Sequence, residues 1–282
     1  MTAAILRERI ESALSQNASG ALNGDAFQVV DDLLSALESG EIRAAEKTAD
    51  GKWNAVPWVK RGILLGFQIG SLTDMSDSDS LLRFFDKNTY PPRALLVEDG
   101  VRVVPGGSAI RRGAYVSPGV VCMPPMYINV GAHVGKGTMV DSHALVGSCA
   151  QIGERVHLSA AAQIGGVLEP VNASPVVVED DVIVGGNCGI YEGTVVRERA
   201  VIGAGVVLTR GTPVFDLVRE AVYRGSAQQP LEIPPDAVVV PGARKVNSTW
   251  AEREGLSLQT PVIVKYRDDK TDSATALEGW LR

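Results

Sequence analysis

The chain has 282 residues, which is enough for a repetitive fold with flanking modules. Apolar residues make up 45% of it, aromatic residues only 5%, and there are 30 glycines, a composition typical of a thin interior filled by small aliphatic side chains. The formal net charge of −6 argues against a nucleic-acid-binding protein, because phosphate contacts need a basic face.

The start of the chain and its cysteines bear on the cellular compartment. Residues 1–10 mix acidic and basic side chains without a long apolar run, so neither a secretory signal nor a membrane span is predicted. Cys122, Cys149 and Cys188 show no paired spacing, which indicates reduced thiols. We therefore expect a cytoplasmic protein.

The first hundred residues predict a small, mainly helical domain over 1–100. Apolar residues recur at helical spacing over 3–16, 25–40 and 58–67. Asp50-Gly51 lies between two short extended runs, as in a β-hairpin.

A six-residue repeat follows and dominates the sequence. Apolar residues recur every six positions from Ile110 to Ile164, and again from Val178 to Leu208. Residues two positions earlier are small or β-branched, and glycines and charged residues lie between the pairs, where the chain must turn. This period predicts a parallel β-helix with three short faces per coil of 18 residues, because neither an amphipathic helix nor a meander sheet keeps such a register.

The repeat also sets the other domain boundaries. We expect the β-helix over 101–245 and a C-terminal extension over 246–282, with a strand at 261–266 and a terminal turn at 277–281. An external loop is expected at 165–175, where the repeat is interrupted. Loops that leave a rigid scaffold often have a function such as covering a cleft.

The register of the repeat tests for a metal site. Residues that stack on one edge must differ by multiples of 18, and His133, His143 and His157 differ by 10, 14 and 24. No metal site is therefore predicted, although an intersubunit zinc site of a hydratase stays an alternative. The same arithmetic places Asp141 beside Ser159, and His143 beside Ala161. Asp141 points outward, as expected of an amine-binding group or of a solvated turn residue.

Several segments resemble the tetrahydrodipicolinate N-succinyltransferase family. They include Gly137-Thr-Met-Val-Asp141, Val146-Gly-Ser-Cys-Ala-Gln-Ile-Gly153, Val156-His-Leu-Ser159 and Ile164-Gly-Gly-Val-Leu-Glu-Pro170. The resemblance spans nearly the whole chain. It implies a left-handed β-helix and a homotrimer with active sites between subunits. It also implies succinyl transfer from succinyl-CoA to the amine of acyclic 2-amino-6-oxopimelate, in lysine and diaminopimelate biosynthesis.

The resemblance and the chemistry together nominate substrate-binding residues. By motif match, Arg102 and Asp141 fall on the family's substrate-binding arginine and aspartate. We expect Asp141 to orient the amine and act as the catalytic base. Arg102 or Arg111 is suited to a substrate carboxylate. Ser159, stacked beside Asp141, completes the predicted substrate site.

The acyl donor is expected to be a co-substrate, succinyl-CoA or acetyl-CoA, with no tightly bound cofactor. Backbone N–H groups of Gly165 and Gly166 could contact the pantetheine arm or the thioester oxygen, although glycines where a loop leaves a scaffold have an equally good structural reason. Ala161 is included in this predicted CoA site, because the resemblance places the acyl arm near the run Ala160–Ala162. Lys245 and Lys265 are candidates for the CoA phosphates, and a solvated surface is the alternative for each.

The sequence departs from the family near the predicted acceptor site. His143 replaces a family tryptophan, Ala160–Ala162 replace a glycine-rich run, and Gly189 replaces a glutamate thought to contact the substrate amine. These changes leave open a related N-acyltransferase with another amino-acid acceptor, such as the enzyme of tabtoxin biosynthesis. They also leave open an inactive β-helix scaffold.

Overall fold

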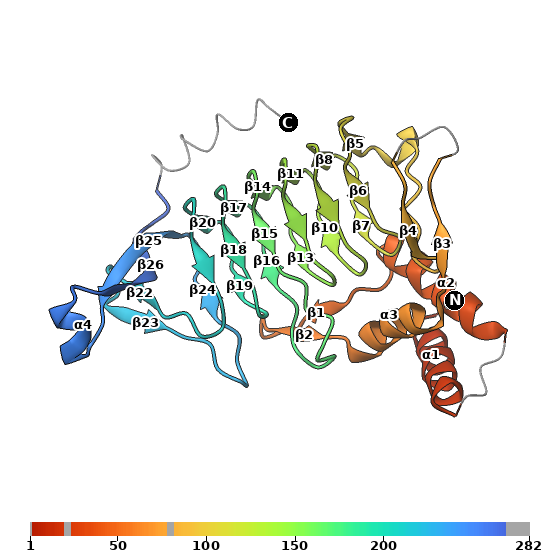
Figure 1. Ribbon diagram of the computed structural model, residues 1–282, viewed down its shortest axis with the longest axis horizontal. Helices are drawn as coiled ribbons and strands as arrows, with labels where there is room; N and C mark the ends of the chain where they lie inside the picture. The colour runs from red at the N-terminus through yellow and green to blue at the C-terminus, as the bar shows by residue number, and fades with distance from the viewer. Residues whose placement is uncertain (1, 20–23, 78–81, 269–282) are drawn as a thin grey trace.

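The computed structural model describes residues 2–19, 24–77 and 82–268, and the predicted turn at 277–281 lies outside them. A parallel β-helix forms the body of the protein, with helices at its N-terminal end and a β extension at its C-terminal end (Figure 1). No helix in these ranges is long and apolar enough to cross a membrane.

Three parallel faces make up the β-helix, and each coil contributes one two-residue strand to each face. Face I contains β5 (Arg102–Val103), β8 (Val121–Cys122), β11 (Met139–Val140), β14 (His157–Leu158), β17 (Ile183–Val184) and β20 (Val201–Ile202). Face II contains β6 (Ala109–Ile110), β9 (Tyr127–Ile128), β12 (Leu145–Val146), β15 (Gln163–Ile164), β18 (Gly189–Ile190) and β21 (Val207–Leu208). Face III contains β7 (Tyr115–Val116), β10 (His133–Val134), β13 (Gln151–Ile152), β16 (Val177–Val178), β19 (Val195–Val196) and β24 (Glu232–Ile233).

The predicted six-residue repeat fills the interior. In each of these strands beyond the first coil the second residue points inward, so Val140, Val146 and Ile152 are fully buried in successive strands of one coil. Small residues two positions earlier, such as Ala144 and Ala150, are buried beside them because residues two apart in a strand share a side. Burying each Val or Ile side chain contributes about 1.5–3 kcal/mol before entropy is counted.

The corners between faces need a residue in the left-handed backbone region. Gly137 (φ +69°) meets this need without strain, but His143 (φ +62°) and Ala161 (φ +59°) occupy the same position in the corners between faces I and II. A residue with a Cβ pays about 1–2 kcal/mol for this conformation. The burial of the inward side chains therefore outweighs the backbone strain at the corners, and residues with a Cβ are held in the left-handed conformation there.

Helices α1 (Ala3–Ala18), α2 (Asp25–Glu38) and α3 (Pro57–Ile69) confirm the three predicted helical segments. Their apolar faces form one core that also includes Val130 and Cys149, from corners between faces II and III. The helices are thereby packed against the β-helix. Two strands, β3 (Leu72–Asp74) and β4 (Phe85–Lys87), and a short 3₁₀ helix, η1 (Val97–Asp99), lead into the first coil.

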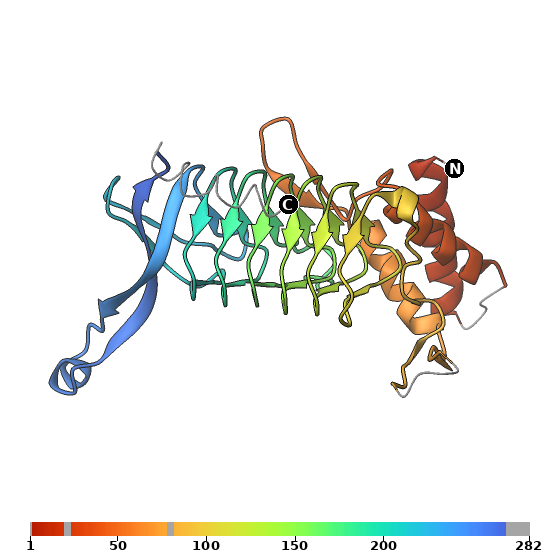
Figure 2. The ribbon, with the colours of Figure 1, turned by 90° about the horizontal axis from the view of Figure 1, so that it is seen from above.

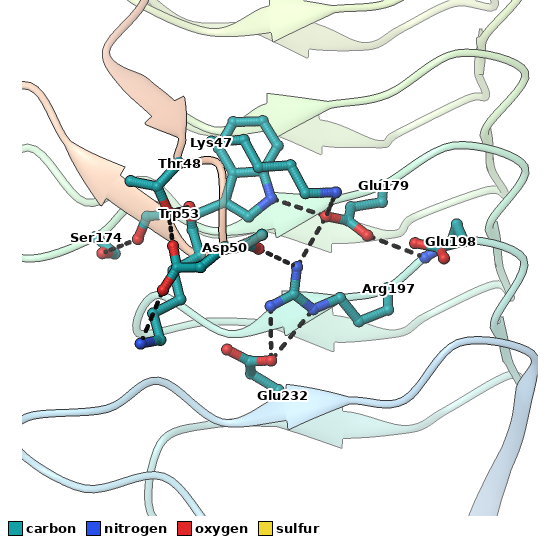
Figure 3. A network of polar contacts seen from close by, with 11 residues as sticks. Lys47, Thr48, Asp50, Trp53, Ser174, Glu179, Arg197, Glu198 and Glu232 are labelled. Atoms are coloured by element: carbon teal, nitrogen blue, oxygen red, sulfur yellow. Dashed lines mark hydrogen bonds and ion pairs between the residues drawn. The ribbon is translucent and has the colours of Figure 1, made fainter.

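The predicted hairpin consists of β1 (Ala45–Lys47) and β2 (Trp53–Ala55), which pair antiparallel and lie along face III (Figures 1 and 2). Glu179, which follows β16, is the centre of the contacts that hold it (Figure 3). Its Oε1 accepts a hydrogen bond from Trp53 Nε1 at 2.8 Å and lies 2.8 Å from Lys47 Nζ and 3.0 Å from Arg197 Nη1. Burial alone would raise the pKa of Glu179, but these donors, Glu198 and the charge of Arg197 outweigh burial and lower the pKa to about 2.

Replacing Trp53 by phenylalanine is expected to lower the free energy of unfolding by about 1 kcal/mol, because the hydrogen bond to Glu179 is lost while a smaller aromatic ring remains. Urea denaturation followed by circular dichroism measures the change. Trp250→Phe is the control, since Trp250 is 58% exposed and should leave stability unchanged. Equal effects of the two substitutions would contradict the hydrogen bond's contribution.

The interruption of the repeat forms a loop between β15 and β16, as predicted. This loop does not project into solvent alone but contacts the N-terminal domain. Lys60 Nζ, on α3, donates to the carbonyl of Ala173, and Ser174 Oγ donates to the carbonyl of Trp53 at 3.3 Å. Leu168 packs against the helical core. The loop is therefore clamped to α3 and the hairpin.

The C-terminal extension begins within the last coils. Strands β25 (Ala237–Lys245) and β26 (Ser257–Tyr266) pair antiparallel, joined by α4 (Thr249–Arg253), and β25 continues face I beside β20. β22 (Val214–Asp216) and β23 (Ala221–Tyr223) complete this ten-stranded sheet. The predicted strand at 261–266 is confirmed as the second half of β26.

Candidate active site

Asp141 is the first residue of the corner between faces I and II, directly after β11. Its N–H donates to the carbonyl of Leu158 on the next coil at 2.9 Å, which fixes the backbone. Its Oδ1 accepts the N–H of Ser142 at 2.7 Å, a local contact that aspartate commonly makes in turns. The side chain remains 30% exposed. The carboxylate is thus held at one oxygen and accessible at the surface.

His157, on β14, faces the other carboxylate oxygen. Its Nε2 lies 3.9 Å from Asp141 Oδ2, and its side chain is only 11% exposed. The 18-residue spacing places Ser159, not His157, beside Asp141. His157 instead lies opposite Met139, two positions before Asp141, so the spacing alone did not predict its contact with Asp141. The signal that could have found it is the outward position of His157 on the adjacent coil.

Other predicted residues gather at or near the same corner. Ser159 is half-buried one coil beyond Asp141, and the N–H of Ala161 donates to the carbonyl of Ser142 at 2.8 Å. Arg102 is exposed on β5, which is two strands from β11 on face I. Two ladder steps correspond to about 10 Å. Arg102, Asp141, Ser159 and Ala161 therefore lie on one side of the protein.

Arg111 lies at a different corner, between faces II and III. It forms an ion pair with Asp86, on β4, and its guanidinium lies 5.1 Å from the ring centre of Phe67 and 5.3 Å from that of Tyr90. Its side chain is 14% exposed. Within one chain Arg111 is thus engaged by the N-terminal domain and is not brought to Asp141. Its predicted contact with substrate stays a prediction.

The glycines predicted to bind the acyl donor pack against neighbouring backbone. A Cβ on Gly166 would lie 2.5 Å from the nitrogen of Ser148, and one on Gly147 would lie 2.1 Å from the nitrogen of Gly166. A Cβ on Gly165 would lie 2.7 Å from the ring of Tyr191. Close approach of two coils therefore explains these glycines, and a role in binding CoA stays a prediction.

The two predicted phosphate-binding lysines lie on the C-terminal extension. Lys245 Nζ is 2.8 Å from Glu252 Oε1, and Lys265 Nζ is 3.2 Å from Asp268 Oδ1. Both side chains are exposed, 71% and 44% respectively, so both can reach a ligand at the surface.

Tyr191 takes the space of a side chain at Gly189. Gly189 is the outward residue of β18, and a Cβ there would lie 2.4 Å from Cε2 of Tyr191. The ring thus covers Gly165 and Gly189 together. Next to them on face II, Gln163 Nε2 donates to the carbonyl of His143 in the Asp141 corner, at 3.1 Å. An aromatic surface therefore adjoins the corner of Asp141, a feature that the sequence alone did not reveal.

The cysteines offer no activated nucleophile. All three are buried and unbridged, and burial raises the pKa of the Cys122 and Cys149 thiols to about 12. Within 2–19, 24–77 and 82–268, no three His, Cys, Asp or Glu side chains are close enough to hold a metal ion. The partly exposed carboxylate of Asp141 is chemically able to accept a proton from a molecule bound at this corner.

The six-residue repeat and the parallel β-helix place the protein in a class, the hexapeptide-repeat transferases. A family model described as the hexapeptide repeat of succinyl-transferase matches residues 175–210, and one described as the tetrahydrodipicolinate N-succinyltransferase N-terminal domain matches residues 5–69.

Full-length relatives narrow the class to a family. The chain is 38% identical over 290 aligned positions, covering 100% of both chains, to 2,3,4,5-tetrahydropyridine-2,6-dicarboxylate N-succinyltransferase of Nitrobacter hamburgensis. The identity and coverage are the same for the enzyme of that name from Bradyrhizobium diazoefficiens. The chain therefore belongs to the tetrahydrodipicolinate N-succinyltransferase family, as its motifs predicted.

A solved structure supports the fold. A crystal structure of a putative 2,3,4,5-tetrahydropyridine-2-carboxylate N-succinyltransferase from Campylobacter jejuni matches with a TM-score of 0.53 at 17% identity, over 84% of this chain and 62% of that one. Together with the hexapeptide-repeat match, it confirms the predicted fold class, a left-handed parallel β-helix with N-terminal helices and a C-terminal β extension.

Proposed function

We propose that this protein is a CoA-dependent N-acyltransferase that transfers succinyl from succinyl-CoA to the amine of acyclic 2-amino-6-oxopimelate. This substrate is the open form of tetrahydrodipicolinate, an intermediate of lysine and diaminopimelate biosynthesis. The observation that carries the proposal is the 38% identity over the whole chain to relatives named for this reaction.

Asp141 is the proposed base. The amine reaches the site mainly as an ammonium group, since a reference pKa near 8 leaves only about a tenth neutral at pH 7. Two protons leave the nitrogen during the reaction: Asp141 takes one for release to solvent, and the departing CoA thiolate takes the other. The nitrogen forms a bond to the thioester carbonyl carbon as the carbon–sulfur bond breaks. Asp141 is suited to this because Ser142 holds one oxygen and the second remains available.

Substrate carboxylates are assigned to Arg102, which is exposed on the same side as Asp141. The active site is proposed to lie between subunits of a homotrimer, where a second chain brings further groups to this corner. Within one chain, Arg111, Gly165 and Gly166 lie at another corner than Asp141. In the proposed trimer, the same three residues of a neighbouring subunit contribute to the site.

A second candidate function is an N-acyltransferase with a different amino-acid acceptor. Tyr191 favours it, because its ring fills the space above Gly189, where the family resemblance implies a glutamate. A smaller or less charged acceptor would fit such a surface better than a diacid amine.

A thiol-release assay distinguishes the two functions. Succinyl-CoA and acetyl-CoA are each combined with 2-amino-6-oxopimelate and with shorter amino acids, and free CoA is measured. Succinyl-CoA with 2-amino-6-oxopimelate is expected to give the highest kcat/KM, by at least 10-fold. A preference for a shorter acceptor would establish the second function. Absence of thiol release with every pair, together with no thermal stabilisation by either acyl-CoA, would identify an inactive scaffold.

A further inference from the structure

A cavity of about 710 Å³ lies between the β1–β2 hairpin and face III, away from the Asp141 corner. Most charged side chains that line it are paired: Lys47 with Glu179, and Asp181 with Arg155. Among the contacts of residues 2–19, 24–77 and 82–268, Arg43 and Glu198 have no ion-pair partner, and neither has Lys136 at the exposed rim. The cavity wall therefore carries a cation, Arg43, and an anion, Glu198, that form no ion pair with a described residue.

Arg43 is held in a fixed orientation. Its Nε donates to Gln151 Oε1 at 2.9 Å, and Gln151, which is 1% exposed, is itself anchored by donating from Nε2 to the carbonyl of Cys149 at 2.8 Å. The guanidinium lies 5.4 Å from the ring centre of Trp53. The edge formed by the two Nη atoms remains for a bidentate contact with a carboxylate.

Glu198 supplies the opposite charge. Its N–H donates to Glu179 Oε2 at 3.3 Å, and Glu179 is already compensated by Lys47 and Arg197, as Figure 3 shows. Glu198 thus adds a second carboxylate beside Glu179, whose own charge is already paired with two cations. Hydrogen bonding to Glu179 raises the pKa of Glu198. A cation at this point would relieve the repulsion between the two carboxylates.

The spacing of the two charges limits the ligand. Arg43 is tied to Gln151 on β13, whereas Glu198 follows β19, and β16 lies between these strands. Two ladder steps separate the two groups by about 10 Å along the β-helix. The ammonium and carboxylate of an α-amino acid share one carbon and cannot reach both. A polyanion such as CoA is disfavoured because the carboxylate of Glu198, which has no ion-pair partner among the described residues, lines the same wall.

We propose that this cavity is a second ligand site, which binds an ω-amino acid or a similar zwitterion with its charges at opposite ends of a chain. The carboxylate binds the Nη edge of Arg43, the aliphatic chain crosses the ring of Trp53, and the ammonium group binds Glu198.

Isothermal titration calorimetry of the full chain with 6-aminohexanoate tests this proposal. Hexanoate and hexylamine, which each lack one charge, are expected to bind at least 10-fold more weakly. Arg43→Gln and Glu198→Gln are each expected to weaken binding of 6-aminohexanoate at least 10-fold. Glu198 is exposed, so its variant is expected to fold even if the Arg43 variant loosens the hairpin.

Asp141→Asn separates this site from the acyl-transfer site. It is expected to leave 6-aminohexanoate binding unchanged, while Arg43→Gln and Glu198→Gln leave the rate of thiol release unchanged. Equal affinities for the three probes, or unchanged binding in Glu198→Gln, would overturn the proposal. Loss of binding in Asp141→Asn would also overturn it, because the ligand would then occupy the acceptor site.

Discussion

Replacing Asp141 by asparagine is expected to lower kcat for thiol release by about 10²–10⁴-fold, the usual contribution of a general base. Asparagine keeps the size of the side chain and can still accept the N–H of Ser142, so the corner should keep its conformation. What is lost is the carboxylate that takes a proton from the amine. Steady-state kinetics with succinyl-CoA and 2-amino-6-oxopimelate measure the effect.

Asp180→Asn is the matched control for this experiment. Asp180 also lies at a corner and also accepts a backbone N–H, that of Glu154 at 2.9 Å, but its corner joins faces III and I. Its substitution should leave kcat unchanged. Both variants should elute at the wild-type oligomer size. Wild-type activity in Asp141→Asn would refute the role of Asp141, and equal losses in the two variants would point to a structural effect.

The β-helix could be predicted from sequence because its interior is a local pattern. Each inward residue, such as Val140 or Ile152, is specified by its own position in a six-residue unit, and the same unit is repeated many times. The helices were predictable for a similar reason, since amphipathic spacing is local. Contacts between modules have no such signal. The clamping of the loop by Lys60, from a helix more than a hundred residues earlier, is an example.

The site was only partly predictable for the same physical reason. Asp141 lies beside Ser159, and His143 beside Ala161, because residues 18 positions apart stack on neighbouring coils, which arithmetic on the sequence supplies. The approach of His157 to Asp141 depends on the direction of a side chain across two coils, and the pairing of Arg111 with Asp86 depends on how β4 meets the first coil. Neither follows from spacing, so both required the structure.

His133 is expected to make the protein sensitive to acid. Its ring stacks on Tyr115, with centroids 4.4 Å apart, and its Nδ1 has no hydrogen-bond partner among the described residues. Burial, assisted by the charge of Arg43, lowers the pKa of His133 from 6.5 to about 3. Above pH 6.5 the folded and unfolded chains both carry neutral imidazole, so this residue does not make stability depend on pH.

Below pH 6.5 the unfolded chain binds a proton that the folded chain excludes until about pH 3, so protonation favours unfolding. At pH 5 the loss of unfolding free energy from this residue is about 2 kcal/mol. His133→Phe keeps a ring against Tyr115 and removes the proton site, so its stability should fall less between pH 7.5 and pH 5, by that amount. Urea denaturation at both pH values measures the difference.

His143→Asn is the control. His143 lies at an exposed corner with φ +62°, a conformation that asparagine tolerates, so this variant should show the same fall in stability as the wild type. If His133→Phe also retains it, another group is responsible for the acid sensitivity.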